Sequence, residues 1–201
     1  MKINYQTLEK KIDVKFKNKD LLIQALTHKS FNPSENNEKI EFLGDRVLGL
    51  VIAKKLLEIY PEEKEGILDK KFASLVNKKT CLDIAKKINL ASYVKTFNPN
   101  NKKIKIEDKI ISDSCEALIG AIYLDKGFTI VEKTILNLWQ DHIEKSVVTE
   151  IDAKTKLQEL TLKNFKKLPT YKLIFFAISR HVFLLTKDAN FLSRIPSFSS
   201  G

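Results

Sequence analysis

The sequence has few cysteines and no long apolar run. Cys81 and Cys115 are the only cysteines among 201 residues, and they form no C-x-x-C pair. This excludes a disulfide framework and a Cys-rich zinc site, and we expect both residues to be buried free thiols in a reducing compartment. No stretch is apolar for long enough to span a bilayer, and residues 1–20 lack the apolar region of a secretory signal. We therefore expect a cytoplasmic protein without membrane attachment.

The sequence does carry a large and unevenly distributed positive charge. Hydrophobic residues make up 43% and charged residues 30%, as in a globular protein. The net charge of +10 favours a polyanionic partner, either nucleic acid or a membrane surface. Residues 1–150 carry 26 basic and 22 acidic side chains, a net +4, whereas residues 151–201 carry 9 and 3, a net +6. The C-terminal quarter is thus far more basic per residue.

The first 148 residues are predicted to be almost entirely helical. Asp20 is expected to cap the first helix, Asn36 or Asn37 to begin the second, and Pro61 to end it. Gly127 is well placed to end the fourth. Polar loops are expected over residues 31–37 and 98–101. The predicted helices cover residues 21–26, 38–60, 65–88, 107–126 and 129–146.

After residue 148 the pattern changes. We expect a linker over residues 149–153 and then a second, smaller domain over residues 154–201. Its first part, residues 154–165, is predicted to be a helix. Residues 170–177, rich in aromatic and aliphatic side chains, are predicted to be β-rich, and the Ser-rich residues 193–201 to be disordered. The predicted fold class is therefore mainly α, with a partial α+β module at the end.

Three carboxylates share one stripe of the predicted helix 38–60. Glu38, Glu41 and Asp45 fall within about 60° of one another on a helix. Like charges at this spacing repel, so something must offset them. A divalent cation would do so, and hard oxygen ligands suit Mg²⁺ or Mn²⁺. Taken alone, however, such a stripe is more often a solvated face without function.

A second acidic pair, Asp113 and Glu116, lies in an apolar stretch of the predicted helix 107–126. Carboxylates are costly to bury there unless they are paired or bound to a metal. If the two acidic helices cross, Glu41 and Asp45 can face this pair and form an all-oxygen cage. Lys109, four residues before Asp113, could instead act as an ion-pair partner, so a metal site and a salt bridge remain equal alternatives on these residues alone.

Gly44 stands inside the first acidic helix, where glycine costs roughly 1 kcal/mol relative to alanine. Close approach of another helix, or of a substrate backbone, would explain its presence. The alternative, that Gly44 merely accommodates packing, is compatible with either of these explanations.

Three segments resemble the motifs of the ribonuclease III family, in order and in spacing. They are residues 25–30 (ALTHKS), 37–45 (NEKIEFLGD) and 113–121 (DSCEALIGA), and the resemblance extends over about residues 5–148. It implies an all-helical endonuclease domain over residues 1–148 that works as a homodimer on double-stranded RNA. Cleavage with Mg²⁺ would leave 5′-phosphate and 3′-hydroxyl ends, and the substrates would include ribosomal and messenger RNA precursors.

The same resemblance implies roles for individual residues. Glu41, Asp113 and Glu116 would ligate Mg²⁺, with Mn²⁺ as a substitute, and Asp45 would complete the catalytic set with Glu116. Phe42 would be an anchor of the dimer interface. Glu38 and Glu65 would line the RNA-binding valley nearby. Apart from the resemblance, Lys109 is expected either to touch phosphate or to pair with Asp113.

The C-terminal part departs from the family pattern. Residues 152–160 resemble the start of a double-stranded-RNA-binding domain, which would make Gln158 and Glu159 contact candidates, and residues 169–171 continue the likeness. Beyond about Ile174 the expected strands and the final Lys-rich helix are not recognisable. A truncated or frame-shifted module is the preferred interpretation, and a diverged one is the alternative.

Two other classes of protein compete with the nuclease. A catalytically silent duplex-RNA-binding or ribosome-associated protein would keep the same fold without cleavage, but the complete acidic set favours the enzyme. A basic membrane-surface protein would need an amphipathic basic helix with an exposed apolar face, and none is evident in the sequence.

Overall fold

The computed structural model describes residues 3–97, 106–148, 153–168, 171–172 and 185–186. The chain divides into two compact units, Met1–Thr149 and Glu150–Gly201. Most of the expected linker, and the expected loop at 98–101, lie outside the described residues. Within the described ranges, no helix is both long enough and apolar enough to cross a membrane.

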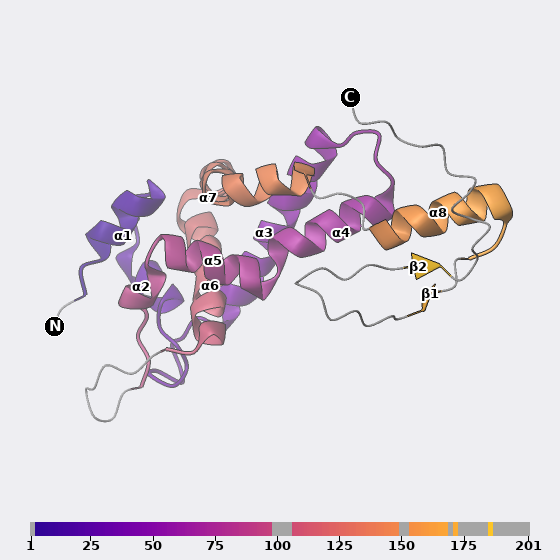
Figure 1. Ribbon diagram of the computed structural model, residues 1–201. Helices are drawn as coiled ribbons and strands as arrows, with labels where there is room; N and C mark the ends of the chain where they lie inside the picture. Colours follow the sequence, from indigo (N-terminus) through magenta and orange to yellow (C-terminus); the bar gives the residue numbers. More distant parts are fainter. Residues whose placement is uncertain (1–2, 98–105, 149–152, 169–170, 173–184, 187–201) are drawn as a thin grey trace. The chain divides into compact units, whose positions relative to one another are not determined.

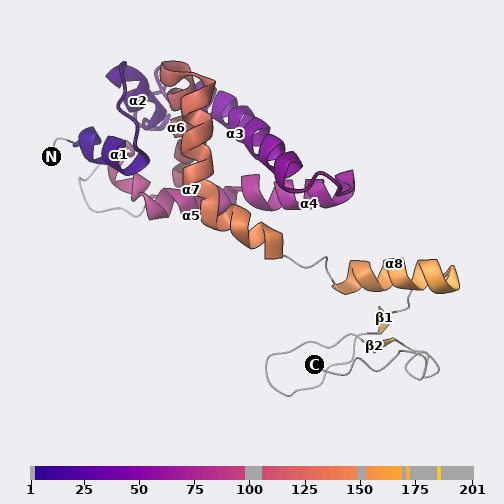
Figure 2. The same cartoon turned by 90° about the horizontal axis from the view of Figure 1, so that it is seen from above.

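The first unit is a bundle of helices around a central one (Figure 1). Its elements are α1 (Tyr5–Ile12), α2 (Lys19–Ala25), α3 (Glu38–Ile59), α4 (Glu65–Val76), α5 (Lys78–Lys87), the short 3₁₀ helix η1 (Leu90–Tyr93), α6 (Asp108–Lys126) and α7 (Phe128–Val148). The α6 helix contacts α2, α3, α5 and α7, and its longest interface is with α3. Figure 2 shows α3 and α6 side by side from a second direction. Every residue from Ile111 to Ile122 is buried as a result.

The termini of the two acidic helices were predicted correctly. The α3 helix follows Asn37, and the side chain of Asn36 accepts a hydrogen bond from the Glu38 amide at 3.1 Å. Pro61 comes just after its end. Gly127 ends α6 with a φ of 77°, a conformation that favours glycine, and its amide donates to Tyr123 O at 2.8 Å.

The prediction of one helix over residues 65–88 is wrong, because α4 and α5 are separate helices. Asn77 lies between them in an extended conformation. Its side-chain oxygen accepts a hydrogen bond from the Thr80 amide, while its side-chain nitrogen donates to Ala73 O and Ser74 O. One asparagine thus ends α4 and caps α5, since its side chain replaces backbone partners at both termini.

Asp20 was also assigned the wrong role. The N-cap of α2 is Asn18, whose side chain accepts hydrogen bonds from the Asp20 and Leu21 amides. Asp20 lies in the first turn, where its charge favours the positive end of the helix dipole.

The second unit contains α8 (Ala153–Phe165) and two short antiparallel strands, β1 (Tyr171–Lys172) and β2 (Leu185–Thr186). The predicted helix over 154–165 is confirmed. The predicted β-rich run is described only at β1, and β2 was not expected. Residues 193–201 lie outside the described part of the chain.

Candidate metal centre

Two glycines let α3 and α6 cross in backbone contact. A Cβ atom on Gly44 would lie 1.8 Å from the backbone oxygen of Glu116, and one on Gly120 would lie 2.3 Å from that of Ile40. Neither position leaves room for a side chain. Gly44 therefore serves the approach of another helix, and this crossing places one acidic helix against the other.

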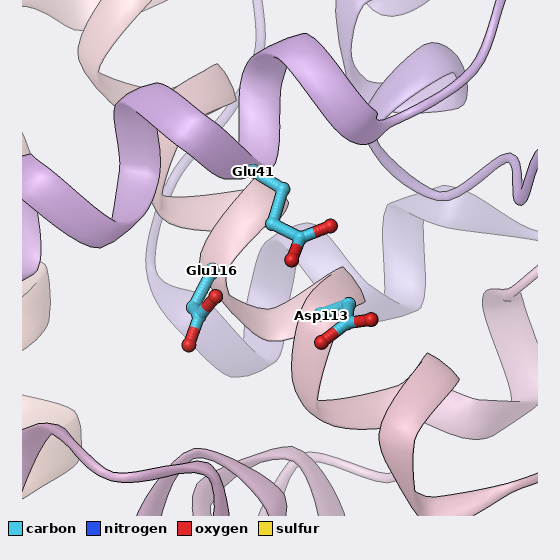
Figure 3. A group of neighbouring side chains, drawn as sticks. All are labelled: Glu41, Asp113 and Glu116. Carbon is cyan, nitrogen blue, oxygen red and sulfur yellow. The ribbon is translucent and has the colours of Figure 1, made fainter.

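The crossing brings three carboxylates together. Glu41, Asp113 and Glu116 each offer an oxygen atom, and these atoms lie within 4.8 Å of one another (Figure 3). Glu41 extends from α3, the other two come from α6, and both α6 carboxylates are buried. Three hard oxygen donors at this separation fit Mg²⁺ or Mn²⁺.

Two lysines neutralise part of this charge. The Lys78 ammonium, at the start of α5, lies 2.7 Å from Asp113 Oδ1, 2.8 Å from Glu116 Oε2 and 3.4 Å from Glu41 Oε1. The Lys109 ammonium lies 2.8 Å from Asp113 Oδ2, so each oxygen of Asp113 faces an ammonium. The ion pair with Lys109 was anticipated as an alternative to a metal. Lys78 was not anticipated, because no local pattern links it to residues 35 and 38 positions away.

The three carboxyl groups differ in their affinity for protons. Burial raises the pKa of Glu116 above its usual value, and it does the same for Glu41, where the charge of Asp113 adds to the effect. Burial also opposes ionisation of Asp113, but hydrogen bonds from Lys109 and Lys78 outweigh it and lower the pKa of Asp113. Asp113 is thus the carboxylate that is most firmly held in its charged form.

Both cysteines lie beside this centre as buried free thiols, as predicted. The Cys81 thiol donates to Glu116 Oε1 at 3.7 Å. Burial raises the pKa of Cys81 and raises that of Cys115 to about 12, so both remain protonated thiols at neutral pH.

The fourth acidic residue of the expected catalytic set, Asp45, does not join the cluster of three. Its carboxylate pairs with Arg46 at 2.8 Å and is partly exposed. It is near enough for its charge to contribute to the raised pKa of Glu116.

An open pocket extends from the carboxylates along the start of α3. It is lined by His28, Lys29, Asn37, Glu38, Glu41, Phe42, Arg46, Lys109 and Asp113. Glu38 and Lys109, both expected near the substrate, therefore adjoin the metal ligands, and Glu38 pairs with Lys29 at 2.8 Å. Glu65 is the exposed first residue of α4 and is not part of this lining. In the second unit, Gln158 is half-buried on α8, and the side chain of Glu159 lies outside the described part.

The fold and site define a mainly helical protein whose helical first unit carries an acidic centre suited to a divalent cation. A family model described as Ribonuclease-III-like matches residues 18–142. Ribonuclease 3 of Pelagibacter ubique is 67% identical over 181 residues, which is 90% of this chain and 82% of that protein. Ribonuclease 3 of Aliarcobacter butzleri is 41% identical over 174 residues, 85% of this chain and 77% of that protein. The chain belongs to the ribonuclease III family.

Solved structures agree with this assignment. The crystal structure of the nuclease domain of ribonuclease III from Campylobacter jejuni, at 2.2 Å resolution, matches with a TM-score of 0.64 and 42% identity. The match covers 75% of this chain and all of that domain. A second structure of that domain, which concerns flexibility in a region involved in dimer formation, matches with a TM-score of 0.65 and 43% identity over 71% of this chain and 98% of that one.

Proposed function

We propose that the protein is an endoribonuclease that hydrolyses double-stranded RNA and leaves 5′-phosphate and 3′-hydroxyl ends. Mg²⁺, or Mn²⁺ in its place, would be held by Glu41, Asp113 and Glu116. The observation that carries the proposal is the convergence of these three carboxylates within 4.8 Å, in a chain with 67% identity to a ribonuclease 3. In a catalytically silent relative, Lys78 and Lys109 alone would have to offset the cost of burying these carboxylates.

The acidic residues of the site would have different roles, according to where they lie. A divalent cation held by Glu41, Asp113 and Glu116 would supply an activated water and would neutralise charge on phosphate oxygens. Asp113 and Glu116 are buried on α6, whereas Glu41 on α3 is partly accessible. Asp45, on the same stripe of α3 as Glu41, would orient water or the substrate.

The pocket beside the cluster suits an RNA backbone. Lys109 and Arg46 present cations along it, and duplex RNA is recognised mainly through phosphates and 2′-hydroxyls. Glu38 lines this pocket. The family resemblance assigns Glu65, together with Glu38, to the RNA-binding valley.

The functional unit is proposed to be a homodimer formed through α3. Phe42, Leu50 and Leu57 are large apolar side chains of this helix, and each is more than half exposed in the single chain. Burying them against a second copy would remove apolar surface from water. One structure of the similar nuclease domain from Campylobacter jejuni concerns flexibility in a region involved in dimer formation.

The second unit is proposed to be an incomplete double-stranded-RNA-binding module that adds affinity. The helix α8 would present Gln158 and Glu159 to a minor groove, and the net +6 of residues 151–201 would attract phosphates. We also propose that the protein acts in the cytoplasm, where it processes ribosomal and messenger RNA precursors.

The decisive experiment is incubation of the purified protein with a long RNA duplex, with Mg²⁺ or with EDTA. We expect cleavage of the duplex in Mg²⁺ only, with single-stranded RNA of the same sequence left largely intact. Binding of the duplex without cleavage in Mg²⁺ and in Mn²⁺ would instead support the catalytically silent alternative.

A further inference from the structure

Lys78 occupies an unusual place for a surface lysine. Its ammonium contacts one oxygen from each of the three carboxylates, at 2.7, 2.8 and 3.4 Å. It therefore lies in the space that these oxygens enclose. A cation that ligated the same three carboxylates would compete with this ammonium for space and for oxygen atoms.

The location of Lys78 on α5 is unfavourable without that contact. It is the first residue of the helix, the first turn contains no acidic residue, and Lys79 follows it. Cations at a helix N-terminus are opposed by the helix dipole. The carboxylates of α3 and α6 offset this cost, because hydrogen bonds with Asp113 and Glu116 hold the ammonium there.

The exposure of the Lys78 side chain indicates that its contact with the carboxylates is reversible. The Lys78 side chain is 53% exposed, while those of Asp113 and Glu116 are 7% and 4% exposed. The lysine thus approaches the cluster from the solvent side, and its long stem can rotate outward without disturbing the core. Lys109 differs, because it contacts a single carboxylate and is 78% exposed.

From these observations we propose that Lys78 is a tethered counter-cation of the metal centre. Its ammonium stabilises the three carboxylates while no metal is bound, and it leaves the cluster when a divalent cation enters. At sufficient concentration the divalent ion displaces the ammonium, because it carries twice the charge. This inference rests on the proposed metal site, and it adds that the chain itself sets the metal affinity through competition.

The test is Mn²⁺ binding to the metal-free protein, followed by the electron paramagnetic resonance signal of free Mn²⁺. If the lysine leaves the site open about one tenth of the time, its removal tightens binding about tenfold. We therefore expect Lys78→Met to lower the Kd for Mn²⁺ by about tenfold. In EDTA the same variant should melt at a lower temperature than the parent, and saturating Mn²⁺ should raise its Tm by more than it raises that of the parent.

Lys79→Met is the matched control, because it removes an equal charge one residue away, and no contact with the cluster is found for Lys79 in the described residues. Its Kd for Mn²⁺ should stay within about twofold of the parent value. An unchanged or weaker Kd for Lys78→Met would overturn the inference while leaving the metal site intact. Equal tightening in both variants would overturn it as well, because long-range charge would then explain the effect. If neither the parent nor either of the two variants bound Mn²⁺, the metal site and the inference would both be refuted.

Discussion

The side chain of Glu116 is almost completely enclosed, with Oε2 on the Lys78 ammonium and Oε1 facing the Cys81 thiol. Burial opposes ionisation of this carboxyl group and raises its pKa, and the hydrogen bond from Lys78 offsets only part of that effect. A neutral side chain of the same shape would fit there with little strain, which makes this residue well suited to a test of the proposed chemistry.

We expect Glu116→Gln to lower duplex cleavage in Mg²⁺ by at least about a hundredfold, because a lost metal ligand removes charge stabilisation worth several kcal/mol. Duplex binding in EDTA, measured by gel shift, should remain close to that of the parent. Glu62→Gln, the same substitution at an exposed residue between α3 and α4, serves as the control. Cleavage by Glu116→Gln at near-parental rates would refute the assignment of the metal ligands.

At the scale of elements, the α3–α6 crossing depends on the absence of a side chain at Gly44. The atom that a Cβ would meet, at 1.8 Å, belongs to the Glu116 backbone and not to a flexible side chain. The α6 helix cannot shift locally, because other helices enclose it along the same stretch.

Gly44→Ala is therefore expected to destabilise the protein by about 1–3 kcal/mol or more through overpacking, despite the better helix propensity of alanine. Urea unfolding followed by circular dichroism measures this. Gly66→Ala is the control, since a Cβ at Gly66 in α4 meets nothing within 4 Å and should be neutral or stabilise by up to about 1 kcal/mol. Equal stability of Gly44→Ala and the parent would show that the crossing is looser than the structure indicates.

The C-terminal turn of α6 also fixes the segment that leads into α2. Asp125 accepts hydrogen bonds from the Lys17 and Asn18 amides, each at 2.8 Å. Burial alone would raise the pKa of Asp125, but these two hydrogen bonds and the nearby Lys126 outweigh it and lower the pKa. Because the folded pKa lies below the unfolded one, the stabilisation is present above the ordinary value of 3.8 and is lost as the pH falls further.

We expect Asp125→Asn to reduce the free energy of unfolding at pH 7 by about 1.5 kcal/mol, the lower end for hydrogen bonds to a charged group. The difference from the parent should shrink as the pH falls below about 4. Asp69→Asn, at an exposed position on α4, should change little at either pH. A difference that stayed constant down to pH 2.5 would contradict the role of the ionised carboxylate.

At the scale of the whole molecule, the apolar side chains along α3 predict self-association. Phe42 is 63% exposed in the single chain and has the Arg46 guanidinium 4.0 Å from its ring centre. Truncation of a buried aromatic side chain costs about 3–5 kcal/mol, so Phe42→Ala should weaken a dimer through this face by more than about a hundredfold in Kd.

Sedimentation equilibrium of the parent, Phe42→Ala and Phe97→Ala distinguishes the possibilities. Phe97 is 64% exposed and lies outside α3, so its truncation should leave the dimer unchanged. A parent protein that is monomeric at micromolar concentration would contradict the proposed dimer, and equal effects of both variants would contradict the choice of face.

The division into two units gives a prediction about the C-terminal part. Deletion of residues 152–201 removes 9 basic and 3 acidic side chains but none of the residues around the carboxylate cluster. We expect the shortened protein to cleave duplex RNA at low salt almost as fast as the parent. Cleavage by the parent should be steeply salt-sensitive, because the lysines of the tail contribute through counterion release, and the shortened protein should show a shallower dependence of RNA affinity on salt. Loss of cleavage at low salt would show that the second unit is part of the active enzyme.

The helices that carry the site follow from local patterns in the sequence. Proline and glycine mark the ends of α3 and α6, and the carboxylate spacing within each helix is a local property that follows from helical geometry. The break at Asn77 is local too, but it was missed because an asparagine inside an apolar pattern is also compatible with a continuous helix.

Which charged groups meet depends on how the helices pack against one another. Glu41 reaches Asp113 and Glu116 because glycines at 44 and 120 let two backbones touch, and Lys78 joins them from a third helix. Asp45 shares the stripe of Glu41 but lies one helical turn further along, where its carboxylate pairs with Arg46 and is not one of the three clustered carboxylates. Helical periodicity fixes the direction of a side chain relative to its own axis, whereas contact between helices depends on where their axes cross, and that is set by packing over the whole core.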